Sequence, residues 1–190
     1  MEIKAIFAER FKSARLMNGF SLQDLADALD NQVSRQALHK YEKGEVIPDA
    51  EKINRLSNAL NVNPDFFFRT NKIEFSNIEF RKLDKLPKKE ATIIQEKAKE
   101  YLSRYLELEE ILGLKNKFEH PLVDYPVVTS YKQVNKAAEI IREKWSLGNG
   151  PIYNIVELLE EKNIKIVKMD ASVTFDGLQA FANDIIPVVA

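Results

Sequence analysis

Cysteine is absent from the 190-residue chain, which excludes disulfide bonds and thiolate metal sites and fits a reducing cytoplasm. Long apolar runs are also absent, and none approaches the ~20 residues that a membrane-spanning helix needs. The first thirty residues carry charges throughout, unlike a secretory signal peptide. From these absences we expect a cytoplasmic protein without membrane association.

The chain also has almost no excess of positive or negative charge. The formal net charge is −1, and residues 1–70 contain as many Lys and Arg as Asp and Glu. Overall electrostatic attraction therefore gives no reason to expect nucleic-acid binding. Any such binding must depend on where the charges lie.

Catalytic signatures are scarce. The sequence has no Gly-rich phosphate loop, no G-x-S-x-G motif and no cysteine nucleophile. Its two histidines, His39 and His120, lie in different segments, and neither belongs to an H-E-x-x-H motif. The acidic residues Glu157, Glu160 and Glu161 are expected on the solvated face of a helix. We predict no catalytic residue, metal site or cofactor within this chain.

Apolar periodicity divides the chain into three expected parts, residues 1–70, 71–117 and 118–190. The expected fold class is mainly α with a smaller α/β part: a five-helix domain, a long connecting helix and an incomplete α+β domain. The five short helices are delimited by local start and stop signals. These signals are Asn18-Gly19, Ser21 with Asp24, Ser34, Lys43-Gly44, Pro48-Asp49 and Asn63-Pro64.

The middle part is expected to contain a strand or hairpin in "IEFSNIEFRK" and a helix from Pro87 to about Leu112, closed by Gly113. Its apolar residues follow a short heptad seam, which favours packing against the chain's own domains but leaves self-association open. The seam consists of Ile94, Ala98, Tyr101, Tyr105, Leu108 and Leu112.

The last part is expected to begin with a helix capped by Ser130 and Gln133, and a second helix with Pro151 in its first turn. The first of these should pack through Val134, Ala137, Ala138, Ile141 and Trp145. The segments "IKIVKMD", "LQAFA" and "IIPVVA" are typical of strands. The final one, Ile185 to Ala190, is expected to be the start of a buried strand, although few residues remain to supply its partners. Because a domain rarely ends on an unprotected apolar strand, this ending favours a truncated or degenerate domain.

The helix expected from Ser34 divides its residues between two roles. Three apolar residues, Ala37, Leu38 and Tyr41, hold it against its neighbours, and six polar residues are left outward: Ser34, Arg35, Gln36, His39, Lys40 and Lys43. Arg suits guanine and Gln suits adenine in a major groove, while Lys and His can contact phosphates or base edges. An ordinary solvated helix face is the alternative explanation.

The segments "FKSARLMNGFSLQDLADAL" and "VSRQALHKYEKGEVIPDAEKINRLSNALNVNPDFFF" resemble the Cro/repressor-type, or XRE, helix-turn-helix family. The resemblance spans residues 6–68. It implies a double-stranded DNA operator as partner, usually bound by a homodimer. It also implies that Arg35, Gln36 and Lys40 face bases, beside Ser34 and His39, and that Arg15 and Glu42 form a buried pair. Phe66 to Phe68 and the helix of residues 87–112 are both candidate dimer surfaces.

Two features depart from the family pattern. The link "DNQVS" is about two residues longer than usual, which could tilt the reading helix or add a contact through Asn31 or Gln32. Leu22 occupies the position where the family often has a phosphate-binding Gln. Gln23, the next residue, could replace that contact.

Residues 70–190 resemble the ImmA/IrrE-type metallopeptidase domain that follows such helix-turn-helix domains. The resemblance rests on "YLSRYLELEEILG", "AAEIIREKWSLGNGPIYNIVELLEEKNIKIV" and "FDGLQAFAND". In that family the zinc helix would follow beyond Ala190, so whether the protein is an enzyme stays open. The main hypothesis is a DNA-binding transcriptional regulator. The alternatives are a fragment of a zinc-dependent regulatory protease and an antitoxin-like protein that binds a toxin or peptidase.

Overall fold

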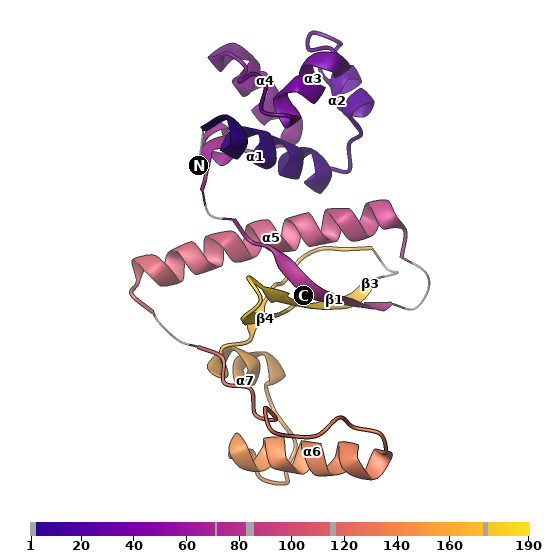
Figure 1. Ribbon diagram of the computed structural model, residues 1–190, viewed down its shortest axis with the longest axis vertical. Helices are drawn as coiled ribbons and strands as arrows, with labels where there is room; N and C mark the ends of the chain where they lie inside the picture. Colours follow the sequence, from indigo (N-terminus) through magenta and orange to yellow (C-terminus); the bar gives the residue numbers. More distant parts are fainter. Residues whose placement is uncertain (1–2, 71, 83–85, 115–116, 173–174) are drawn as a thin grey trace.

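The computed structural model describes residues 3–70, 72–82, 86–114, 117–172 and 175–190. Figure 1 shows a body of N-terminal helices above a long helix, α5, which crosses over a small sheet. Two further helices, α6 and α7, lie on the other side of the sheet, with α6 farthest from the N-terminal body. The architecture is mainly helical with a smaller α/β part, as the sequence predicts.

The N-terminal helices begin where the capping signals place them. Ser21 and Asp24 form a complete capping box, and the side chains of Ser34 and Asp49 each accept a backbone hydrogen bond from the first turn that follows. The fifth segment differs from the prediction, because it is a single 3-10 turn and Asn63 makes no side-chain cap. The elements are α1 (Ile3–Met17), α2 (Leu22–Ala28), α3 (Arg35–Glu42), α4 (Ala50–Leu60) and η1 (Pro64–Phe68).

An aromatic core holds these helices together. Phe7 and Phe11 of α1 and Phe67 of η1 are completely buried, and the rings of Phe7 and Phe67 lie 5.5 Å apart. Aromatic pairs at such separations add roughly 0.5–1.5 kcal/mol beyond the burial of their surface. Phe66 is also buried, at 1% exposure, so most of this segment is used inside the domain rather than for dimer formation.

The sheet joins strands that are far apart in the sequence, in the order β1-β3-β4-β2. β1 pairs antiparallel with β3, β3 antiparallel with β4, and β4 parallel with β2. The C-terminal strand is buried, as its apolar sequence predicts: β4 lies between β3 and β2, and Val188 is 1% exposed. The strands are β1 (Phe75–Lys82), β2 (Lys165–Ile166), β3 (Phe175–Ala182) and β4 (Ile186–Val189).

The long helix α5 (Lys88–Ile111) covers the sheet and also carries the N-terminal body. Of the expected seam, Ile94 and Ala98 are buried, so packing within the chain accounts for this part of it. Beyond Ala98 the buried residue is Leu102, which packs with strand residues such as Val188, whereas the seam residues Tyr101 and Leu108 are exposed. The C-terminal end of α5 is not covered by the described residues: Ile111 is 75% exposed, and Leu112, directly after the helix, is 62% exposed.

The helices α6 (Tyr131–Lys144) and α7 (Ile155–Glu161) depart from the expected packing. Ser130 caps α6 as predicted, but of the expected inner face only Ala137 is buried; Val134 and Ala138 are exposed. Pro151 precedes α7 rather than opening it, because Asn154 is the N-cap residue. Ile141 and Trp145 are half-buried, so the described residues cover this α6 face only in part.

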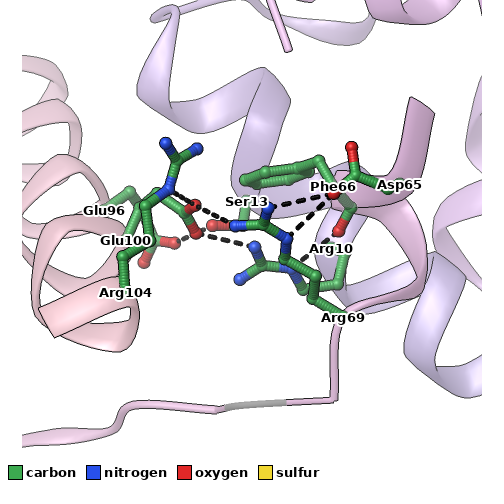
Figure 2. Close-up of polar contacts among 8 residues, drawn as sticks. All are labelled: Arg10, Ser13, Asp65, Phe66, Arg69, Glu96, Glu100 and Arg104. Atoms are coloured by element: carbon green, nitrogen blue, oxygen red, sulfur yellow. Dashed lines mark hydrogen bonds and ion pairs between the residues drawn. The ribbon is translucent and has the colours of Figure 1, made fainter. Parts of the chain in front are cut away.

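A polar junction fixes the N-terminal body on α5 (Figure 2). Arg10 of α1 donates a hydrogen bond of 2.6 Å to Glu100, and Ser13 donates one of 2.6 Å to Glu96. Arg69 and Arg104 also approach Glu100, at 3.7 and 2.7 Å. Since the Arg10 and Glu100 side chains are only 12% and 11% exposed, water screens this ion pair less than a surface pair.

Candidate nucleic-acid interface

The orientation of α3 follows from the two apolar side chains that anchor it. Leu38 is completely buried, and Tyr41 is 6% exposed. The ring of Tyr41 stands edge-on to Phe7 and Phe11 of α1, with centroids 6.4 and 6.2 Å apart. Burial raises the pKa of the Tyr41 hydroxyl. Ala37, the third expected anchor, is partly buried, so the predicted inward face is confirmed in outline.

A buried ion pair sets the end of α3 against α1. Arg15 Nε donates to Glu42 Oε1 at 2.6 Å, and both side chains are 11% exposed. Arg15 also donates to the carbonyl oxygen of Phe20, which follows α1. The pair implied by the family resemblance is thus present, and it keeps the only acidic residue of α3 turned away from the outer face.

The outer face of α3 is polar and basic. All six predicted residues are exposed: Ser34, Arg35, Gln36, His39, Lys40 and Lys43. Ser34 Oγ accepts a hydrogen bond of 3.2 Å from the Ala37 amide and so caps the helix. Within the described parts of the chain, no side chain forms a hydrogen bond or ion pair with the other five. Their donors are therefore available to a ligand, although the domain as a whole has no net charge.

The long turn between α2 and α3 is held by the protein itself. Asp30 and Asn31 both adopt left-handed backbone angles, with φ of 53° and 55°. Val33, at 3% exposure, anchors the end of the turn in the core. The Gln32 side chain accepts a hydrogen bond from Arg55 of α4. Of the two residues considered for an added DNA contact, Gln32 is therefore already engaged, and Asn31 is exposed.

The start of α2 is less suited to a phosphate contact than the sequence predicts. Leu22 is half-buried against the core. The side-chain amide of Gln23 donates a hydrogen bond of 2.9 Å to the carboxylate of Asp27 on the same helix. Asp24 accepts a hydrogen bond from the Ser21 backbone amide at 2.8 Å. That bond, with a smaller contribution from the charge of Lys89, holds the Asp24 pKa below its usual value. The acid at this edge therefore stays ionised.

The structure adds a residue that the sequence reasoning missed. Lys89, in the first turn of α5, lies against Gly19 and near Asp24, beside the start of α2. The available signal was the basic segment of residues 81–89, but nothing local indicates which surface that segment joins.

No metal centre emerges from the described residues, which hold no group of three or more possible metal-binding side chains. His39 lies on the outer face of α3, whereas His120 lies in a loop, where its Nδ1 accepts a hydrogen bond from the Leu122 amide. Within those same ranges, none of the helices combines the length and apolar character needed to cross a membrane.

Comparison with known proteins assigns a family to the N-terminal part. The helix-turn-helix family model HTH_3 matches residues 11–67. The SPbeta prophage-derived uncharacterized HTH-type transcriptional regulator YonR of Bacillus subtilis (strain 168) is 39% identical over 70 residues. That alignment covers 37% of this chain and 63% of the relative. No solved structure matches the chain. Residues 11–67 are therefore similar to helix-turn-helix domains.

Proposed function

We propose that the protein is a sequence-specific transcriptional regulator that binds double-stranded DNA through α3. One observation carries the proposal: the exposed face of α3 has five polar or basic side chains without partners among the described residues, in a domain of the helix-turn-helix family. The name of the Bacillus subtilis relative, an HTH-type transcriptional regulator, supports the same role. Such a role places the protein in the cytoplasm.

In this mechanism α3 enters the major groove from its N-terminal end. Arg35 is assigned to guanine O6 and N7, and Gln36 to adenine N6 and N7, because these pairs match two donors or acceptors at once. Lys40 and His39 reach base edges farther along the groove, and Lys43 reaches a phosphate. Phosphate contacts supply affinity, and the base contacts supply the choice of sequence.

The proposal is tested by selecting binding sites from a pool of random duplexes with the purified full chain. We expect one enriched motif of limited length, bound about 10³-fold or more tightly than an unrelated duplex at physiological salt. Footprinting should place the protected bases on one face of the duplex. A pool that stays random after repeated rounds, with only salt-sensitive weak binding, would contradict the proposal.

We further propose that the regulator binds as a homodimer, with the exposed apolar end of α5 as its contact surface. A two-fold dimer would present two copies of α3 about one helical turn apart, and the operator would be a matching palindrome. Ile111→Glu with Leu112→Glu should turn the dimer into a monomer in sedimentation experiments, because the contact would bury two carboxylates from each protomer.

The control for that experiment is Val127→Glu with Val128→Glu, which places the same two charges on other exposed apolar positions, 86% and 41% accessible, and should leave the dimer intact. A dimer that persists in the Ile111/Leu112 variant would show that the contact lies on another surface. A wild-type monomer at working concentrations would exclude the dimer.

For residues 71–190 we propose a regulatory domain, supported by the sequence resemblance to ImmA/IrrE-type peptidases. Stoichiometric zinc in the protein purified from its native host, together with any residues that follow Ala190, would favour the protease alternative over a plain regulator. Co-purification of a stoichiometric toxin or peptidase would favour the antitoxin-like alternative. A metal-free homodimer with operator affinity would count against both.

A further inference from the structure

The helices α1 and α5 run antiparallel, and their contacts fix which end of α5 lies near the DNA-binding helices. Arg10 of α1 meets Glu100, and Ser13, one turn later, meets Glu96. The next contact in this series is at Gly19, where a Cβ would lie 2.8 Å from Ile93 Cδ1. The first turn of α5 is therefore placed beside the connection from α1 to α2.

Figure 1 shows the same arrangement, with the N-terminal end of α5 on the side of the molecule where α1 passes into α2. The stem of Lys89 crosses this connection: its Cε would lie 3.1 Å from a Cβ on Gly19. Lys89 shares a surface recess with Ser21 and Asp24, the residues that cap α2. A cation from outside residues 1–70 thus stands at the start of the helix that supports α3.

At the start of α2, the local charge favours an anionic partner only because α5 contributes lysine side chains. Asp24 is ionised and exposed there, and it would repel a phosphate. Lys89 offsets that charge, and its neighbour Lys88 adds a second exposed cation. Thr92 donates a hydrogen bond to the backbone carbonyl oxygen of Lys88, but no described residue forms a hydrogen bond or ion pair with the side-chain amine of Lys88 or Lys89. Residues 81–90 hold five Lys or Arg against two Asp or Glu, in a chain whose formal net charge is −1.

The position of these lysines is also well defined. The Arg10–Glu100 and Ser13–Glu96 contacts join α5 to α1, and α1 is joined to α3 by the Arg15–Glu42 pair. Because each link is at least partly buried, α5 and α3 form one connected structure. A duplex that accepts α3 in its major groove then has a sugar–phosphate backbone beside α2 and the start of α5.

We propose that Lys88 and Lys89 bind backbone phosphates of the duplex at the edge of the site read by α3. This inference rests on the proposed function of α3, and it extends the DNA-binding surface beyond the helix-turn-helix domain onto α5. The ligand is the phosphate backbone, so the contribution is to affinity and not to the choice of bases.

The test is the full chain with Lys88→Gln and Lys89→Gln, titrated against the selected duplex by fluorescence anisotropy between about 50 and 300 mM salt. Each lost phosphate contact should reduce the slope of log K against log salt by about 0.9. We expect a slope smaller by about 1–2 and an affinity loss of roughly 3- to 30-fold at 100 mM salt. The preference for the selected sequence over a scrambled one should change little.

Two control variants make the outcome specific. Lys132→Gln with Lys136→Gln removes the same charge from exposed positions of α6, at the opposite end of the molecule, and should leave the slope unchanged. Lys88→Arg with Lys89→Arg keeps both charges and should keep wild-type binding. An unchanged slope in the Gln variant, or an equal loss in the α6 control, would overturn the inference.

The same titrations separate this inference from the function on which it rests. Sequence-selective binding that depends on Arg35 and Gln36 but not on Lys88 and Lys89 would remove only the α5 contact. A wild-type chain with no sequence-selective binding would remove both proposals.

Discussion

Replacing Arg35 and Gln36 together with alanine is expected to reduce operator affinity by about 30-fold or more. Each bidentate contact to a base contributes about 1–3 kcal/mol of discrimination, so two lost contacts give roughly 2–6 kcal/mol. Both side chains are exposed and make no hydrogen bond or ion pair with the described residues, so their removal leaves the packing of α3 unchanged. Unfolding of the variant should therefore match that of the wild type.

The measurement is a gel shift or anisotropy titration with the selected duplex and with a scrambled one. Affinity for the scrambled duplex should fall much less, because Arg35 supplies only one of several charges near the backbone. Lys132→Ala with Asn135→Ala, on the exposed surface of α6, is the matched control and should bind like the wild type. Unchanged operator affinity in the Arg35/Gln36 variant would show that α3 is not the reading helix.

The N-terminal helices were predictable because their ends depend on residues close in sequence. Ser21, Ser34 and Asp49 cap helices by hydrogen bonds that reach only three residues ahead. Gly19 and Gly44 end helices in left-handed backbone angles of 67° and 68°, which glycine adopts without steric cost. A sequence pattern records such contacts directly.

The sheet could be predicted only as separate strands. The C-terminal strands lack enough neighbours of their own, and the missing partner is β1, whose Phe80 pairs with Leu178. That pairing joins residues about a hundred positions apart, and its register depends on side-chain packing with α5, which local strand propensity does not encode. For the same reason the burial of the last strand could be predicted from its apolar residues, but its place between β3 and β2 could not.

In the candidate site, too, local patterns could be predicted from the sequence and long-range contacts could not. Helical periodicity was enough to place Arg35, Gln36 and Lys40 outward, because Leu38 and Tyr41 define the opposite face. Periodicity could not reveal contacts made across the fold. The hydrogen bond from Arg55 to Gln32 is one example, and the approach of α5 to the start of α2 is another.

The Arg15–Glu42 pair gives the second large effect. Glu42→Ala should reduce the free energy of unfolding by about 3 kcal/mol, since it leaves the Arg15 charge buried without its partner. The loss should lie near the lower end of the usual 3–5 kcal/mol range, because Arg15 still donates to the carbonyl oxygen of Phe20. Small domains have about 5–15 kcal/mol in total, so much of the stability of residues 11–67 would be lost.

The expected loss in the free energy of unfolding is large because the pair is buried, and not merely because two charges are paired. Glu51→Ala is the matched control, because Glu51 also pairs with an arginine, Arg55, but its side chain is 77% exposed. Exposed pairs on one helix contribute only about 0.3–0.5 kcal/mol. Both variants are compared by urea unfolding followed by circular dichroism. The double variant Arg15→Met with Glu42→Leu should recover most of the loss, because neither charge then remains buried alone. If Glu42→Ala costs no more than Glu51→Ala, the pair does not hold α3 against α1, and the position of the reading helix must depend on Leu38 and Tyr41 alone.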